Sequence, residues 1–264
     1  MGHILIQNLC KSYKNRRIAR RGVHDPYRIG DWMHILDIPR LEFREGEMVC
    51  LLGPSGCGKS TLLRIIAGFD PHIDGEVIID GQLVTSPSAD HIFVFQQSGL
   101  LPWMTVWQNV ELGVRHLNPA KERQERIREY IEMVDLTSFE QHYPYQLSGG
   151  MQRRAELARA LAASPDVLIM DEPFNGLDFL THMKIREEIV NMHELFRKTT
   201  LLVTHDVDDA LLMGDRIVVL SGRPARVIFN RRLEFSRPRD PKKSAALGDI
   251  RDELFLMLGV SYAV

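Results

Sequence analysis

A glycine-rich loop lies between an apolar run and a helical stretch in the first quarter of the chain. The loop reads Gly53-Pro54-Ser55-Gly56-Cys57-Gly58-Lys59-Ser60 and fits the pattern G-x-x-x-x-G-K-S/T. It follows Met48–Leu52, which has the continuous apolar character of a buried strand, and precedes Thr61–Ala67, which has helical character. Glycines let backbone N–H groups turn inward around phosphate oxygens, at a helix N-terminus whose dipole favours anions. The sequence therefore predicts a strand, a phosphate-binding loop and a helix in succession.

The positions of this loop have separate expected roles. Lys59 would place a positive charge at the β- and γ-phosphates, and Ser60 would offer its hydroxyl to Mg²⁺. The other residues expected to contact the nucleotide here are Gly53, Pro54, Ser55, Gly56, Cys57, Gly58 and Thr61. A chance glycine-rich turn is the alternative, and the flanking strand and helix argue against it.

A second acidic site narrows the chemistry. The apolar run Val167–Met170 ends in Asp171 and Glu172. Asp171 is expected to hold the Mg²⁺ shell, and Glu172 is expected to polarise an attacking water as a general base. Taken alone, an acidic pair at the end of a strand is a solvated loop about half the time. The phosphate-binding loop alone leaves kinases, GTPases and motor ATPases open, but the loop and the acidic pair together predict a hydrolytic site.

The pattern along the chain is typical of an α/β fold with a mostly parallel sheet. Apolar runs alternate with amphipathic stretches, and no repeat of fixed period is visible. The expected strands are Met48–Leu52, Val77–Ile79, Val167–Met170, Leu201–Thr204 and Arg216–Leu220.

A helical insert is expected between Thr105 and Leu136. Thr105 and Gln108 form a capping box in the sequence, and apolar residues from Ile127 to Val134 recur at helical spacing. Asn118-Pro119 and Tyr143-Pro144 interrupt the pattern. Helices are further expected after Ser148, whose hydroxyl can cap one, over Met183–Phe196, and near the C-terminus with Leu247, Ile250, Leu254 and Leu258 on one face.

Composition excludes several classes of protein. The 264 residues are 44% hydrophobic and 26% charged, which argues against disorder and a disulfide scaffold. A formal net charge of -2 gives no global attraction to nucleic acid or anionic lipid. Cys10, Cys50 and Cys57 lack paired spacing and are expected to be reduced thiols in the cytosol. With no signal-peptide pattern and no membrane-spanning run, membrane contact is expected to need a partner.

One segment links the chain to a known family. The residues Leu147-Ser148-Gly149-Gly150-Met151-Gln152 resemble the LSGGQ signature of ATP-binding cassette (ABC) ATPases. The resemblance extends from about Ile4 to Val227. It implies that a second copy presents Ser148 and the amides of Gly149 and Gly150 to the γ-phosphate held by the first copy, so that two ATP molecules lie between two chains.

Other positions match cassette motifs one at a time. Gln96 matches the Q-loop glutamine, which in the family senses Mg²⁺ and the attacking water, and Gln97 is a second candidate by residue type alone. His205 matches the switch histidine that reaches the γ-phosphate, although an isolated histidine is more often structural. Asp178 matches the D-loop aspartate at the dimer seam. Tyr13 matches the aromatic residue that stacks on adenine, with ordinary packing as its alternative.

The resemblance implies a P-loop NTPase (RecA-like) core with an antiparallel β subdomain and an inserted α-helical subdomain. The nucleotide-binding domain would cover residues 1–230, with the helical subdomain at about 98–157, and residues 231–264 would form a C-terminal extension with a terminal helix.

Within the cassettes, the chain is most similar to the ATPase subunits of nitrate, sulfonate and taurine importers. The segments that carry this similarity are Gly99–Val106, His142–Ser148 and Ser221–Val227. In the family a coupling helix of the permease docks just after the Q-loop, so Leu101, Pro102 and Trp103 are expected in that groove, with ordinary packing as the alternative.

The implied function is to bind and hydrolyse ATP and so energise a membrane importer of small anionic solutes such as nitrate, aliphatic sulfonates or taurine. ATP and Mg²⁺ are the implied cofactors. The implied partners are a second cassette, usually an identical copy, transmembrane permease subunits and, indirectly, a periplasmic or extracellular solute-binding protein. The chain would lie on the cytoplasmic face of the inner membrane, held there by the permease. An import system for a different solute is the alternative.

Three other functions are less consistent with the sequence. Soluble cassette proteins that act on DNA or ribosomes usually carry paired cassettes or long coiled coils, which this chain lacks. A small-molecule kinase would share the phosphate-binding loop but has no reason to carry Leu147–Gln152 or His205. An exporter half is disfavoured because no membrane domain is fused.

The chain departs from the family pattern in three places. The signature continues as Met151-Gln152-Arg153-Arg154-Ala155-Glu156, where these importers more often carry Arg then Gln. Before Asp178, Phe174-Asn175-Gly176 replaces Phe-Gly-Ala. A basic insertion from Lys14 through Trp32 stands where the family has a short hairpin. It is read as a solvated loop or as an arm that contacts lipid headgroups or an acidic partner.

Overall fold

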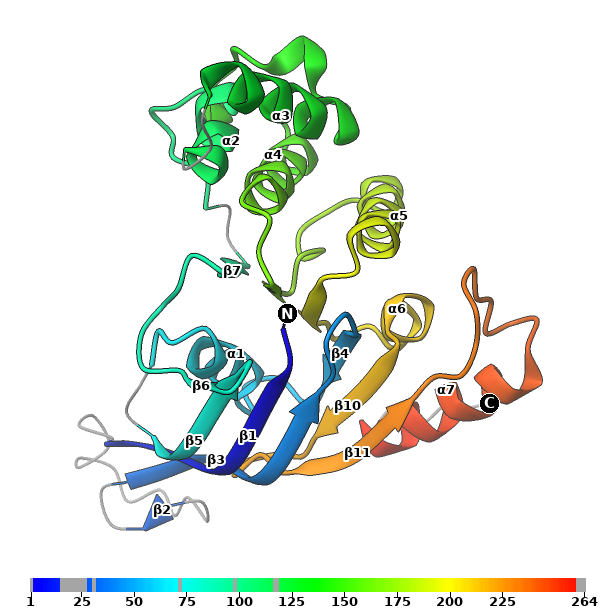
Figure 1. Cartoon of the computed structure of the whole chain (residues 1–264). Coiled ribbons are helices and arrows are strands. Elements are labelled where there is room, and N and C mark those ends of the chain that lie inside the picture. The colour runs from blue at the N-terminus through cyan, green and yellow to red at the C-terminus, as the bar shows by residue number, and fades with distance from the viewer. Residues whose placement is uncertain are drawn as a thin grey trace, which may run out of the picture. The chain divides into compact units, whose positions relative to one another are not determined.

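The structure is a computed structural model that describes residues 2–14, 28–29, 32–70, 73–96, 99–115 and 119–259. It divides into two units, one formed by Met1–Pro87 with Val203–Val264 and one formed by Ser88–Leu202. Figure 1 shows the course of the chain through both. Gln97, Asn118 and most of the basic insertion lie outside the described residues.

The first unit begins with an antiparallel sheet. Its strands are β1 (Ile4–Lys14), β2 (Arg28–Ile29), β3 (Trp32–Phe43), β5 (Asp74–Ile79) and β6 (Gln82–Leu83), in the order β2-β3-β1-β5-β6. In β1 the side chains of Ile4 and Ile6 are fully buried, while those of Leu5 and Gln7, which alternate with them, are less so. This alternation is that of a sheet with one face on the core. The register shifts between Lys11 and Ser12, just before Tyr13.

The first unit also holds the strand and helix around the phosphate-binding loop. Strand β4 (Met48–Leu52) is buried at every residue and runs parallel to β10 (Arg216–Leu220), which pairs in turn with the antiparallel β11 (Val227–Arg232). The helices of this unit are α1 (Lys59–Ile66), α6 (Val207–Met213) and α7 (Ala245–Met257). Burial on both faces explains why β4 reads as a continuous apolar run.

The second unit combines parallel strands with helices. Strand β7 (His91–Val94) runs parallel to β8 (Val167–Asp171), and β9 (Thr199–Val203) is the other neighbour of β8. The helices are α2 (Val106–Val114), α3 (Ala120–Met133), α4 (Gly149–Ala162) and α5 (Phe179–Phe196), with 3-10 turns at Thr137–Phe139 and Pro144–Gln146. Helices α2, α3 and α4 pack together, as Figure 1 shows in green.

Local sequence rules account for the helix starts in the second unit. The Thr105 hydroxyl accepts a hydrogen bond from Gln108 N, and the Gln108 side chain accepts one from the Thr105 backbone N–H, which completes the predicted capping box. Ser148 caps α4 by accepting from Met151 N at 3.3 Å. The predicted apolar residues Ile127, Tyr130, Ile131 and Val134 are all buried.

The α/β fold with a P-loop strand, loop and helix is confirmed. Strands Met48–Leu52 and Arg216–Leu220 have the predicted bounds. The strand predicted at Leu201–Thr204 begins earlier, at Thr199, and Leu258 is only half-buried although it was expected on the apolar face of α7. The domain boundary near 230 and the helical subdomain at about 98–157 stay predictions. Among the described residues, no helix is both long and apolar enough to cross a bilayer.

Candidate functional site

The backbone of the phosphate-binding loop adopts conformations that require glycine. Gly58 has φ 129°, and a Cβ there would lie 2.9 Å from both Ile35 Cγ2 and Leu36 Cδ2. Gly53 has φ 153°, and a Cβ there would lie 2.8 Å from the Leu220 carbonyl oxygen. Larger residues are therefore excluded by both conformation and space. The glycines of the motif therefore allow the loop to adopt its backbone conformation, and they also leave its N–H groups accessible to a ligand.

Lys59 is folded over its own loop. Its side chain is buried, and Nζ donates to the carbonyls of Gly53 at 2.7 Å and Pro54 at 3.0 Å. The N-terminus of α1 has neither a side-chain cap on Gly58 nor an acidic residue in its first turn. The first N–H groups of α1 and the Lys59 ammonium together form a positive cradle that suits an anion.

Tyr13 lies at the rim of a separate hollow of the first unit, about 800 Å³ in volume, which Trp32 and His34 also line. Its hydroxyl donates to Asp70 Oδ2 at 2.6 Å, and Lys11 Nζ is 2.5 Å from Asp70 Oδ1. Burial, followed by the hydrogen bond to Asp70, raises the pKa of Tyr13 to about 12. Tyr13 is 43% exposed, and Lys11 Nζ lies over its ring, 4.8 Å from the centroid, so stacking would use the other face. Asp70, which orients it, was not predicted.

His205 stands in the turn between β9 and α6 and is exposed. The turn is anchored on both sides of it. Thr204 N donates to the Leu51 carbonyl at 3.3 Å, and Asp206 caps α6 by accepting from Asp208 N at 2.7 Å. These hydrogen bonds fix the backbone at His205, so the imidazole has a defined position just after the buried strand β9.

In the second unit, Asp171 and Glu172 follow one another at the end of β8 but have different surroundings. Asp171 is 6% exposed. Glu172 is less buried, and its carboxylate Oε2 accepts from Gln96 Nε2 at 3.2 Å and from Asn175 Nδ2 at 3.3 Å. Two predicted residues, Gln96 and Glu172, are therefore brought together, and Asn175 joins them without having been predicted.

The backbone of Glu172 is left-handed, with φ 48°. A residue with a side chain is uncommon in this region, and such conformations persist where the surrounding structure holds them. Asn175 N donates to the Glu172 carbonyl at 3.2 Å, which closes the turn. The strand therefore ends at Asp171, and the Glu172 carboxylate accepts the hydrogen bond from the Gln96 amide at this turn.

The signature residues occupy an exposed helix start in the second unit. Ser148 and Gly149 are exposed, and a Cβ on Gly149 would meet nothing within 4 Å. A Cβ on Gly150 would instead collide with Thr181 Cγ2. Asp178 caps α5 by accepting from Thr181 N at 3.1 Å, and hydrogen bonds from Thr181 lower the pKa of Asp178. The open face at Ser148 and Gly149 leaves room for an external ligand.

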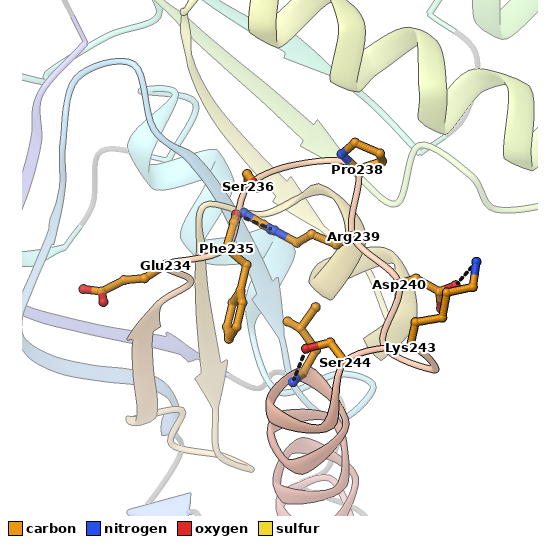
Figure 2. Close-up of a pocket in the computed structure, with 9 residues that line it drawn as sticks. Glu234, Phe235, Ser236, Pro238, Arg239, Asp240, Lys243 and Ser244 are labelled. Carbon is orange, nitrogen blue, oxygen red and sulfur yellow. Dashed lines mark hydrogen bonds and ion pairs between the residues drawn. The ribbon is translucent and has the colours of Figure 1, made fainter.

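The C-terminal extension is tied to helix α6. Arg239 is buried and donates to the carbonyls of Leu211 and Gly214 at the end of α6, as well as to Phe235. Arg251 forms a two-point ion pair with Asp208 in the first turn of α6, at 2.6 and 3.1 Å. Figure 2 shows Arg239 bonded to Phe235 beside a cavity of about 720 Å³. The extension therefore packs against its own unit, as expected.

We expect Arg239→Met to destabilise the protein by about 2 to 3 kcal/mol, because two buried carbonyls lose a charged donor. The measurement is the urea midpoint of unfolding. Lys243→Met is the matched control from the same cavity, because Lys243 pairs with Asp240 at 3.2 Å while being 84% exposed, and exposed pairs contribute little. Equal midpoints for Arg239→Met and wild type would contradict the anchoring role.

Comparisons with known proteins agree on one family. The family described as ABC transporter matches residues 36–175. The uncharacterized ABC transporter ATP-binding protein MJ0412 of Methanocaldococcus jannaschii is 46% identical over 80% of this chain and 79% of its own length. The taurine import ATP-binding protein TauB of Rhizobium johnstonii is 41% identical over 88% of this chain and 91% of its own length.

Further relatives differ in the solute after which they are named. They are 38% to 42% identical and are named for aliphatic sulfonates import in Bacillus cereus and for nitrate import and bicarbonate transport in Synechococcus elongatus. Among solved structures, the dimeric ATP-binding cassette MJ0796 bound to ADP and Pi matches with a TM-score of 0.73 and 34% identity, over 88% of this chain and 100% of that chain. Matches of this extent mean that the chain belongs to the ABC transporter family and is one of its ATP-binding cassette ATPases.

Proposed function

We propose that this chain energises the import of small anionic solutes across a membrane. The observation that carries the proposal is the hydrogen bond from Gln96 to the Glu172 carboxylate in a chain whose relatives are named for the import of taurine, sulfonates and nitrate and for the transport of bicarbonate. These four solutes share a compact anionic group. An ABC ATPase of another import system is the alternative, because the relatives already differ in solute.

The phosphate groups of ATP are proposed to bind in the cradle of the first unit. Backbone N–H groups from Gly53 to Ser60 would donate to phosphate oxygens, and Lys59 Nζ would exchange its bonds to the Gly53 and Pro54 carbonyls for phosphate oxygens. Thr61 would add a contact from the first turn of α1. The exposed ring of Tyr13 is proposed to stack on adenine, and the hydrogen bond to Asp70 would fix its orientation.

Mg²⁺ fits the residues proposed for it. The Ser60 hydroxyl, the Asp171 carboxylate and the Gln96 amide supply the hard oxygen donors that Mg²⁺ prefers. The described residues contain no cluster of three or more His, Cys, Asp or Glu that could hold a metal ion. A nucleotide-dependent Mg²⁺ site does not need such a cluster, since phosphate oxygens and waters complete it. When bound, the ion would neutralise charge on the phosphates.

Glu172 is proposed to accept a proton from the attacking water. The Gln96 amide and the Asn175 amide hold its carboxylate through Oε2, which leaves Oε1 for the water. His205 is proposed to donate to the γ-phosphate, because its turn is anchored and its ring is exposed. A second copy is proposed to present Ser148, Gly149 and Gly150 to that phosphate, with Asp178 at the seam between the copies.

Transmembrane permease subunits are the proposed partners on the side of Trp103, which is 69% exposed. The loop that carries it is held by Asn109, whose Oδ1 accepts from Leu101 N at 2.8 Å and whose Nδ2 donates to the Met104 carbonyl at 3.1 Å. An exposed aromatic residue on a fixed loop suits a docking groove, to which Leu101 and Pro102 would contribute. The permease would hold the chain at the cytoplasmic face of the inner membrane, and a solute-binding protein would act on the far side.

The test is uptake of labelled taurine, an alkanesulfonate, nitrate and bicarbonate by the cells from which the chain comes, with the wild-type chain or its Lys59→Ala variant. We expect accumulation of one of these solutes to fall to background in the variant. The Lys198→Ala variant is the control, since Lys198 pairs with Asp166 at 3.2 Å and takes no part in the proposed site. Unchanged uptake of all four solutes would contradict the solute class.

A further inference from the structure

Arg153, on helix α4, is bonded to acceptors from two other segments, one at Phe95 and one at Glu172 and Pro173. It is 6% exposed. Its Nη1 donates to the Phe95 carbonyl at 2.7 Å, and its Nε donates to the Pro173 carbonyl at 2.8 Å. A longer bond of 3.4 Å runs from Nη2 to the Glu172 carbonyl. A buried guanidinium with this many partners fixes the positions of the segments it joins.

Both segments carry a residue proposed for hydrolysis. Phe95 immediately precedes Gln96, and Pro173 immediately follows Glu172. The 3.2 Å hydrogen bond between Gln96 and Glu172 therefore lies between two backbones that one side chain holds together. These bonds join Arg153 to backbone carbonyls and not to the side chains of Gln96 or Glu172. Arg153 would therefore affect hydrolysis by fixing where these two side chains lie.

Glu156, one turn further along α4, completes the arrangement. It is 1% exposed, and its Oε2 accepts from Arg153 Nη1 at 2.6 Å. Its Oε1 accepts from Gly99 N at 3.0 Å, and Arg159 Nη1 donates to the Gly99 carbonyl at 2.8 Å. Phe95 and Gly99, on either side of Gln96, are thus both bound to α4. Both charges of the buried pair are satisfied, as a low-dielectric interior requires.

We propose that Arg153 and Glu156 are positioning residues that couple helix α4 to the hydrolytic pair Gln96 and Glu172. The inference rests on the proposed role of Glu172. Helix α4 begins at the residues proposed to meet the γ-phosphate of a second copy, so a shift of α4 on closure would be transmitted to Gln96 and Glu172 through Arg153. Misplacing a reacting group by about 1 Å can cost on the order of 100-fold in rate, which makes such coupling effective.

The main test compares the Arg153→Met/Glu156→Met double variant with wild type. Removing one member of a buried ion pair leaves the other uncompensated, whereas replacing both with apolar side chains is often neutral for stability. We expect kcat for ATP hydrolysis to fall about 30-fold, while the Kd for ATP changes by less than about twofold. A kcat within about threefold of wild type in the double variant would overturn the proposal.

Arg154→Met is the matched control. Arg154 is the next residue of the same helix, but its guanidinium bonds to the Val134 carbonyl at 2.9 Å and to Asp135, away from Gln96 and Glu172. We expect its kcat to stay near that of wild type. If the double variant does not fold, Arg153→Lys replaces it, because one ammonium cannot reach both backbones, and a fall in kcat of about fivefold or more is then expected. Wild-type kcat in the Arg153→Lys variant would overturn the proposal.

A double-mutant cycle separates positioning from a general structural effect. In the Gln96→Ala background the bond between Gln96 and Glu172 is already lost, so the double variant should lower kcat by less than about threefold further. A full further loss of about 30-fold would show that Arg153 acts elsewhere and would overturn the proposal. A wild-type chain without ATPase activity at saturating ATP would instead refute the role of Glu172 on which the proposal rests.

Discussion

Glu172→Gln is expected to bind ATP as wild type does and to hydrolyse it at least about 100-fold more slowly. The glutamine side chain keeps an acceptor oxygen for Gln96 and Asn175, so the hydrogen bonds of 3.2 and 3.3 Å can persist. It cannot take a proton from water. Binding and dimer closure would proceed without the step that reopens the dimer, and two chains should remain associated in the presence of MgATP.

Two measurements check this result. Release of phosphate gives kcat, and size-exclusion chromatography with MgATP gives the dimer. Glu187→Gln is the control, since Glu187 is an exposed glutamate on α5. Phosphate release by the Glu172→Gln variant at the wild-type rate would remove Glu172 from the role of base. Slow hydrolysis without a trapped dimer would instead separate proton transfer from closure.

Strand boundaries could be predicted where the apolar run and the strand coincide. Met48–Leu52 and Arg216–Leu220 are such cases, because every or nearly every residue faces a buried environment. The strand predicted from Leu201 begins instead at Thr199, since Thr199 and Thr200 are 0% and 2% exposed. The Thr200 hydroxyl lies 3.4 Å from His193 Nδ1, and such tertiary contacts allow polar residues to be buried. A hydropathy pattern cannot show them.

The candidate site residues follow from sequence motifs, but the side chains that they contact in the fold do not. Glu172 follows from its place after Val167–Met170, whereas its bond to Asn175 depends on the left-handed backbone at Glu172. Asn175 and Arg153 both stand where the sequence departs from the family pattern. These departures from the family pattern mark both residues as unusual in the sequence. Only the folded structure indicates that Asn175 and Arg153 each bond to Glu172.

Lys59→Ala is expected to lose ATP affinity itself, by roughly 10- to 100-fold, because a charge-assisted hydrogen bond to phosphate contributes about 1.5 to 3 kcal/mol. Lys59 Nζ also bonds to the Gly53 and Pro54 carbonyls, so the variant loses a cation that helps to shape the loop. The measurement is the rise in Tm on adding MgATP. A ligand that binds only the folded state raises Tm, and this rise should vanish in Lys59→Ala at ATP concentrations that saturate wild type.

Lys198→Ala again serves as the control and should keep the full rise in Tm, while an unchanged rise in Lys59→Ala would contradict the role of Lys59.

Lys59→Ala and Glu172→Gln together divide the reaction into two stages. Both variants should stop uptake, but Glu172→Gln alone should still respond to MgATP with a higher Tm and a stable dimer. Because closure depends on the difference in ATP affinity between open and closed states, binding without hydrolysis should hold the closed state. Under the proposed role of Glu172, hydrolysis would then be needed to reopen the dimer for the next transport cycle.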